Sequence, residues 1–324
     1  MAKIALKLEQ ALEQRARNGG PGRLAASVLA QGDGWTVRDV VCTSGPHDRA
    51  FEEQHEGVAI AVVVAGSFQY RSNGGGNLMT PGAVLLGNPG QYFECWHQHA
   101  AGDRCISFQY DPDYFVTLTD GDRPHFPAIG ISPCRDLSAV AAKVCAGLSG
   151  SVEARWEELS IALAGRAVEL AGAGSVRSGD LPAGAVARVT RVVRRIERNA
   201  DQNLTVPELA REAGLSPYHF LRVFESMTGL TPHQYLMRAR LRDAAVRLLD
   251  DRGKILDIAF DCGFGDVSNF NRAFRAEFGV SPRAYRAENH GGVSSRESAR
   301  PDKSRPAIKD TTRLRFLGSN AAGF

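Results

Sequence analysis

The front of the chain shows two patterns of apolar positions. Ile4, Leu8 and Leu12 recur at helical spacing, which predicts a short amphipathic helix over residues 3–17. In residues 24–115, short apolar runs alternate with turns rich in Gly, Asn and Pro. Many short strands with frequent turns are typical of a β-sandwich or a small barrel. The front of the chain is therefore predicted to be a β-domain preceded by a helix.

The rest of the chain favours helices. Helical spacing appears in residues 137–148 and 152–171, and again after a stretch rich in Gly, Ala and Ser that reads as a flexible linker. The end of the chain is polar and aperiodic, which predicts a disordered tail. We expect an α+β protein. The predicted front domain is residues 1–171, and the linker is residues 172–184. The all-α back domain is residues 185–289, and the tail is residues 290–324.

One apolar stripe in residues 152–171 suggests a contact between two copies of the chain. The residues at coiled-coil spacing are Val152, Trp156, Leu159 and Leu163. We predict that this stripe forms the seam of a homodimer. The alternative is a helix that packs on its own domain.

Charge is distributed unevenly between these regions. The formal charge is −5 for residues 1–184, +4 for 185–289 and +4 for 290–324. All basic residues in 185–289 except Lys254 are Arg. The planar guanidinium group of Arg makes bidentate hydrogen bonds to phosphates and base edges, which the Lys ammonium group cannot do. A polyanionic partner is therefore expected to bind the back of the chain.

Membrane and disulfide-rich classes do not fit this sequence. The longest apolar run, Val58–Ala65, has eight residues, and the first twenty residues lack the apolar core of a secretory signal. Six cysteines are present without a CxxC pair, which indicates reduced thiols. We predict a cytoplasmic protein with no membrane partner.

The back domain contains an internal repeat. Residues 209–235 align with residues 258–285. Ala210 and Gly214 match Ala259 and Gly263 at an offset of 49. The pairs at an offset of 50 are Phe220/Phe270, Arg222/Arg272, Phe224/Phe274, Gly229/Gly279, Pro232/Pro282 and Tyr235/Tyr285.

Each repeat has the features of a helix-turn-helix. In the first, Thr205 can cap a helix that Gly214 ends, and Ser216 with Pro217 starts a second helix almost at once. Phe220, Val223, Phe224 and Met227 in the first repeat, and Phe270, Ala273, Phe274 and Phe278 in the second, are expected to be buried. The opposite, outward stripes are Tyr218, Leu221, Arg222 and Glu225, and Val267, Ser268, Asn271, Arg272 and Arg275.

Such stripes can contact DNA, because Arg pairs with guanine and Asn with adenine. The alternative is a solvated face in an ordinary helical bundle. One long helix at about Pro232–Leu249 joins the units and can place them roughly 34 Å apart, in successive major grooves.

Two motifs make a family resemblance explicit. LAREAGLSPYHFLRVFESMTGLTPHQYLMRARL and ILDIAFDCGFGDVSNFNRAFRAEFGVSPRAYR, within residues 190–288, resemble the DNA-binding domain of the AraC/XylS family of bacterial transcription regulators. The resemblance implies seven helices, binding to promoter DNA as an activator or repressor, and contact with RNA polymerase if the output is activation. It places six residues at base-reading positions: Tyr218, Leu221, Arg222, Ser268, Asn271 and Arg272. Leu221 departs from the polar residue often found there, so it either touches a thymine methyl or is inert.

The front domain resembles, more loosely, the cupin-like barrel that senses small ligands in this family. The segments that carry this likeness are HEGVAIAVVVAGSFQYR and LMTPGAVLLGNPGQYFECWH. The resemblance implies a small-molecule effector and dimerisation. The aromatic candidates for the pocket are Phe68, Tyr70, Tyr92, Phe93, Trp96, Phe108 and Tyr110, each with core packing as the alternative.

A metal site is a further possibility in the front domain. The candidate ligands are Cys95, His97, His99 and Cys105, with His47 or His55 as an addition. Cys95, His97 and His99 alternate, so on a strand they share one face and suit zinc or iron. A half-buried Cys beside hairpin histidines is the alternative. We expect no cofactor and no enzyme activity. A metal-dependent cupin enzyme or a metal sensor, fused to the DNA-binding domain, is the competing hypothesis.

Overall fold

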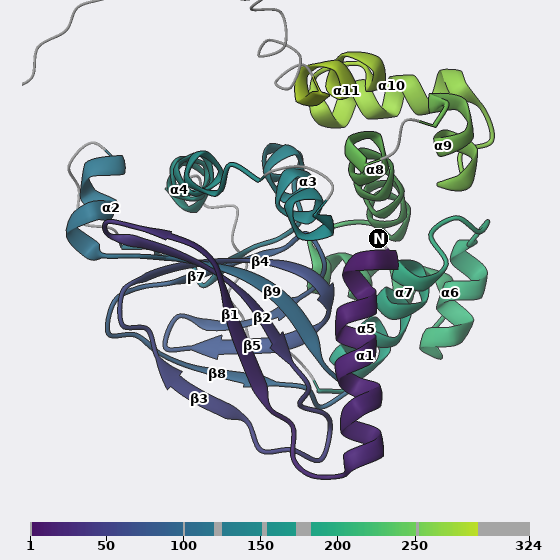
Figure 1. Cartoon of the computed structure of the whole chain (residues 1–324). Coiled ribbons are helices and arrows are strands. Elements are labelled where there is room, and N and C mark those ends of the chain that lie inside the picture. Colours follow the sequence, from purple (N-terminus) through teal and green to yellow (C-terminus); the bar gives the residue numbers. More distant parts are fainter. Residues whose placement is uncertain are drawn as a thin grey trace, which may run out of the picture.

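The structure is a computed structural model that describes residues 2–99, 101–119, 125–150, 154–172, 183–250 and 253–290 (Figure 1). Its fold class is α+β, as predicted, with the strands in the front of the chain. The strands are β1 (Leu24–Gly32), β2 (Trp35–Cys42), β3 (Phe51–Gln54), β4 (Val58–Gly66), β5 (Phe68–Ser72), β6 (Gly75–Met79), β7 (Val84–Gly87), β8 (Tyr92–Trp96), β9 (Asp103–Tyr110) and β10 (Gly130–Ile131). The helices are α1 (Ala2–Asn18), α2 (Pro112–Leu118), α3 (Arg135–Ser149), α4 (Trp156–Gly172), α5 (Ala183–Arg198), α6 (Val206–Ala213), α7 (Pro217–Thr228), α8 (Pro232–Asp250), α9 (Ile255–Asp261), α10 (Val267–Phe278) and α11 (Pro282–His290).

The strands form two antiparallel sheets that face each other as a cupin-like barrel (Figure 1). One sheet has the order β1-β2-β9-β4-β7-β10, and the other has the order β3-β8-β5-β6. The central strand β4 is an uninterrupted apolar run because both of its faces are covered. Ile60 and Val62 pack under the helices, whereas Ala61 and Val63 point into the barrel.

Three helices cover the outer face of the larger sheet. The predicted amphipathic helix is present as α1, and its residues Ile4 and Leu8 are buried. Helices α3 and α4 lie beside each other above the sheet (Figure 1). Helix α2 follows β9 directly and was not predicted, although Pro112 at its first turn is a helix-start signal.

The predicted dimer seam is wrong at its centre. Leu163 is fully buried and Leu159 is 8% exposed, and both belong to the core that α4 shares with the sheet. Trp156 is half-buried against the same core, and Val152 lies outside the described residues. The stripe is occupied within one chain because α4 packs on its own domain, so it cannot also receive a second copy.

The back of the described chain is entirely helical, and residues 183–290 contain seven helices, α5–α11. Each repeat builds its own aromatic core: Phe220 and Phe224 are fully buried in the first, and Phe270 and Phe274 in the second. The predicted linker is described only at its ends, in α4 and α5, and the predicted tail only at residue 290. Among the described helices, none is both long and apolar enough to cross a membrane.

The front and back of the chain are packed together. Leu78 of β6 lies in the core of the first repeat, and Ala142 and Ala146 of α3 lie in the core of the second. The buried Arg242 of α8 donates two hydrogen bonds to Glu197 of α5 and one to the carbonyl of Pro81, in the turn after β6. These contacts hold the helices in one arrangement against the barrel.

Candidate functional site

The first helix-turn-helix consists of α6 and α7, and local capping fixes both ends of the turn. The Thr205 backbone N–H donates to the Glu208 carboxylate at 3.0 Å, which forms a capping box at the start of α6. Gly214 ends α6 with φ of +65°, as its position in the sequence predicted. The Ser216 hydroxyl then accepts from the His219 N–H and starts α7.

The second helix-turn-helix consists of α9 and α10, and it is closed in a similar way. Gly263 has φ of +85°, and a side-chain Cβ there would lie 2.5 Å from the Asp201 carbonyl oxygen. Glycine is needed for both reasons. The Asp266 carboxylate accepts from the Asn269 N–H at 2.7 Å and caps α10.

The predicted base-reading stripe of α7 is on the surface. Tyr218 is 72% exposed, Leu221 is 36% exposed, and Arg222 is also exposed. The Arg222 guanidinium carbon lies 6.0 Å from the centre of the Tyr218 ring, within range of a cation–π contact. Tyr218 thus contacts the Arg222 side chain along the same helix, while the guanidinium group faces outward.

The equivalent stripe of α10 is exposed as well. Ser268, Asn271 and Arg272 are all exposed, although α3 of the front domain packs against other parts of α10. Arg272 donates to the side-chain oxygen of Asn269 at 3.2 Å. Val267 is half-buried rather than outward, because it begins the helix beside the turn. Both stripes are therefore free of the barrel.

Helix α8 connects the two units as predicted. It has 19 residues, which corresponds to roughly 28 Å of helix at 1.5 Å per residue. Leu241, Ala244, Ala245 and Leu248 are buried on the side of the second unit, and Tyr235 and Leu236 on the side of the first. The connector is therefore part of both cores and cannot move independently of them.

The interior of the barrel holds a cavity of about 840 Å³. Of the aromatic candidates, Phe68, Phe93 and Tyr110 line it. The others do not: Tyr70 and Phe108 are packed in the cores, Tyr92 is 65% exposed, and Trp96 lies outside the lining. Polar lining comes from Thr36, Arg38, His55, Ser107 and Gln109. The cavity can therefore take a ligand that combines an apolar part with hydrogen-bonding groups.

His55 is a buried base in the lining of this cavity. Its Nε2 lies 2.9 Å from the Tyr70 hydroxyl, and its ring stacks on Phe93 with 4.2 Å between centroids. Burial lowers the pKa of His55 to about 4. The imidazole is therefore neutral at physiological pH, and it can hydrogen-bond a ligand without carrying charge.

The metal candidates are arranged differently from the prediction. Strand β8 ends at Trp96, so His97 and His99 lie in the loop beyond it and do not continue the strand face of Cys95. His97 turns into the barrel, whereas His99 lines a surface cavity of about 400 Å³ together with arginines of α5. Cys95 and Cys105 line the interior cavity. Of the additional histidines, His55 lines that cavity and His47 is exposed.

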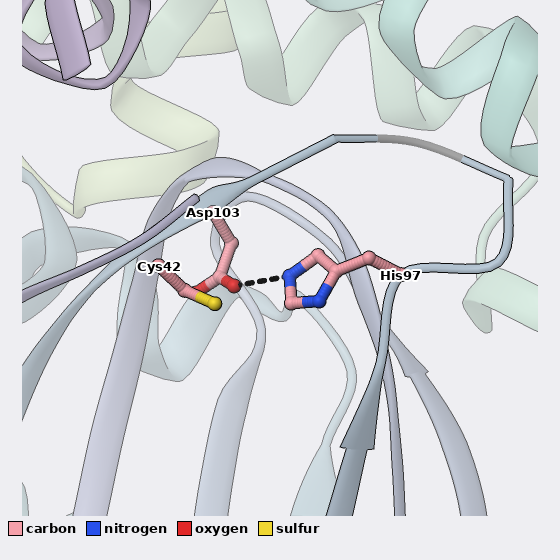
Figure 2. Close-up of side chains that lie close together, drawn as sticks. All are labelled: Cys42, His97 and Asp103. Atoms are coloured by element: carbon pink, nitrogen blue, oxygen red, sulfur yellow. Dashed lines mark hydrogen bonds and ion pairs between the residues drawn. The ribbon is translucent and has the colours of Figure 1, made fainter. Parts of the chain in front are cut away.

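His97 meets two residues that the sequence reasoning missed, Cys42 and Asp103 (Figure 2). Its Nε2 donates to the Asp103 carboxylate at 2.6 Å. Burial alone would lower the pKa of His97, but hydrogen bonds to Asp103 and Cys42 outweigh it and raise the pKa to about 9. The signal that could have found the pair is the register of β2 against β9, which places Cys42 opposite Asp103.

Comparisons with known proteins match the helical part of the chain. A family profile described as a helix-turn-helix domain matches residues 209–288. The probable transcriptional regulator LumQ of Photobacterium leiognathi is 42% identical over 91 residues, 28% of this chain and 36% of LumQ. The HTH-type transcriptional activator RhaS of Klebsiella pneumoniae is 39% identical over 100 residues, 31% of this chain and 36% of RhaS. The matched region thus spans about a third of each relative.

A solved structure matches over the same part of the chain. It is a transcriptional regulator of Chromobacterium violaceum, described by its AraC-type DNA-binding domain. It is 29% identical, covers 33% of this chain and 96% of its own, and has a TM-score of 0.31. The repeated capped turns, the paired aromatic cores and the matched profile coincide in the same residues. The C-terminal part of this chain is therefore a double helix-turn-helix domain similar to the DNA-binding domains of the AraC/XylS family of transcription regulators.

Proposed function

We propose that the protein is a sequence-specific transcription regulator that reads two successive major-groove segments of promoter DNA with α7 and α10. The observation that carries this proposal is the pair of exposed stripes at equivalent positions of two capped helices. The roughly 28 Å connector is of the length needed to bring the two helices near one turn of DNA apart. In this proposal, residues 185–289 are the DNA-binding domain and residues 1–171 are the regulatory domain.

Each stripe supplies groups suited to base edges. Arg222 and Arg272 can each donate two hydrogen bonds to a guanine, at O6 and N7, and Asn271 can make a bidentate pair with an adenine. Tyr218 and Ser268 can bind phosphate or base edges, and Leu221 can contact a thymine methyl group.

We also propose that a small molecule in the barrel cavity modulates DNA binding. The cavity of about 840 Å³ is of ordinary ligand size, and it is lined by both aromatic and polar side chains. The contacts of the barrel with α5, α7 and α8 offer a path to the DNA-binding helices. An enzyme is the less favoured function, because the two curated relatives are named as regulators.

The partners follow from the same proposal. RhaS is named as an activator, so we propose activation as the output and RNA polymerase as a partner. We propose a homodimer because the cupin-like front domain resembles a dimerising module. The dimer contact is not the Leu159–Leu163 stripe, whose side chains are buried within one chain.

A selected-site binding assay with the full-length chain tests the DNA-reading roles. Arg222→Ala and Arg272→Ala should each relax base preference at one position per site, with the two positions about 10 base pairs apart. The expected loss of discrimination is about 1–3 kcal/mol at each position. The matched control is Arg166→Ala, which removes an exposed arginine of α4. If both variants weaken binding to all sequences equally, the arginines bind phosphates and do not read bases.

A thermal-shift screen against a panel of small metabolites tests the effector. A true effector should raise the melting temperature, because it binds only the folded chain. The shift should be lost in Ser107→Leu, which places an apolar side chain in the cavity, and should persist in Arg166→Ala. DNA binding unchanged by every ligand that shifts the melting temperature would contradict modulation.

A further inference from the structure

One end of the barrel gathers four side chains that can ligate a metal, and they come from two strands and a loop. Cys42 ends β2, Asp103 begins β9, Cys105 follows two residues later on the same face, and His97 lies just beyond β8. The register of β2 against β9 pairs Cys42 with Asp103 directly. Figure 2 shows the side chains of Cys42, His97 and Asp103 pointing toward one another. Distant parts of the sequence thus converge on one point of the interior.

The ligating atoms are close together and buried. One donor atom each of Cys42, His97 and Asp103 lies within 4.8 Å of the others. The Cys105 thiol donates to the second oxygen of Asp103 at 3.2 Å, while His97 donates to the first at 2.6 Å. All four residues are between 5% and 6% exposed. The single carboxylate is therefore the meeting point of an imidazole and a thiol, with a second thiol beside it.

This set of donors has the chemistry of a transition-metal site. Two sulfurs, one imidazole nitrogen and one carboxylate oxygen match the ligand types and the number that zinc prefers, and they differ from the all-oxygen sites of calcium and magnesium. Separations of 2.6 and 3.2 Å are hydrogen-bond distances, so the side chains must part slightly around an ion. All four also line the cavity of about 840 Å³, which gives an ion and water access to the cluster.

We propose that Cys42, His97, Asp103 and Cys105 bind one divalent transition-metal ion of the zinc class inside the barrel. Binding replaces the hydrogen bonds among them. The two thiols become thiolates, the imidazole presents an unprotonated nitrogen, and the released protons pass to solvent. The Phe68 ring, 6.0 Å from the His97 ring, covers one side of the site. Cys42, His97 and Asp103 form the close group, and Cys105 joins it through its hydrogen bond to Asp103. His99 lines a different cavity and is not part of the site.

Metal binding to the full chain is the test. Reduced, chelator-treated protein should take up one equivalent of Zn²⁺ in competition with a chromophoric chelator. Co²⁺ in place of Zn²⁺ should give a thiolate-to-cobalt charge-transfer band and the visible bands of a four-coordinate ion. Cys42→Ser with Cys105→Ser should abolish the charge-transfer band. Asp103→Asn should weaken affinity by at least the roughly 10–100-fold that substitutions outside the ligand shell cost.

The matched control is Cys134→Ser, which removes a half-buried cysteine at the start of α3, outside the cavity lining. It should bind Zn²⁺ as the unaltered chain does. The Co²⁺ spectrum of the unaltered chain decides the proposal even if a variant fails to fold. No thiolate band in that spectrum, or equal loss of binding in Cys134→Ser, would overturn the site. Neither result would bear on DNA binding by α7 and α10.

Discussion

Arg242 joins the barrel, α5 and α8 through buried hydrogen bonds, and its removal should be costly. Its Nη2 donates to both oxygens of Glu197 at 2.7 and 2.8 Å, and its Nη1 donates to the Pro81 carbonyl at 3.2 Å. The side chains of Arg242 and Glu197 are only 10% and 16% exposed. The Tyr235 hydroxyl also donates to Glu197, at 3.1 Å. Substitution by Met keeps the packed stem and removes only the charge and its hydrogen bonds.

The size of the effect follows from these contacts. Leaving one member of a buried ion pair without its partner costs about 3–5 kcal/mol. Glu197 retains Tyr235 and some solvent, so we expect the lower end, about 3 kcal/mol. A domain of this size loses about 2–4 °C per kcal/mol, so the melting temperature should fall by roughly 6–12 °C. The exposed Arg166–Glu169 pair, with side chains 53% and 64% exposed, should contribute little.

Thermal unfolding of three full-length variants measures this difference. Arg242→Met should melt well below Arg166→Ala. The double variant Arg242→Met with Glu197→Leu should recover part of the loss, because no charge is then left buried. If Arg242→Met melts within about one degree of Arg166→Ala, the network does not stabilise the chain and the reasoning is refuted.

Two further predictions concern the front domain. His55 is neutral when folded, with a pKa of about 4 against about 6.5 unfolded. The unfolded chain therefore binds a proton first as the pH falls, and about 3 kcal/mol of stability should be lost between pH 6.5 and 4. Urea unfolding at both ends of this range should show a smaller loss in His55→Gln, and equal losses would contradict the assignment. Leu163→Ala should cost about 2–5 kcal/mol, because Leu163 is fully buried in the core. Sedimentation should show an unchanged oligomeric state, whereas a stable variant that dissociates would restore the stripe as a dimer seam.

The helical half of the fold could be predicted because its signals are local. Thr205, Gly214 and Ser216 determine the first turn through contacts within a few residues, so their positions in the sequence are enough. The repeat then transfers the same interpretation to the second unit, where Gly263 adopts the same positive φ. The exposure of Arg222 and Arg272 followed from helical spacing alone.

The barrel interior could be predicted less well because its contacts depend on strand register. Alternation grouped Cys95 with His97 and His99, but β8 ends before His97. The partners of His97 come from β2 and β9, which are distant in the sequence, and no local pattern marks them. The prediction that the apolar stripe on α4 forms a dimer seam was wrong for a related reason. Coiled-coil spacing identifies a buried face, but it does not say whether the barrel or a second chain covers it.

The shared packing between barrel and helices limits how freely the two halves of this chain can be recombined with those of other proteins. Leu78 completes the core of the first unit, and Ala142 and Ala146 complete that of the second. A chimera that joined this front domain to the helix-turn-helix half of a related protein would lose those matched surfaces, even with both halves intact. To exchange DNA specificity between such proteins, the face of α3 that contacts the helices and the β6–β7 turn would therefore have to be transferred together with those helices.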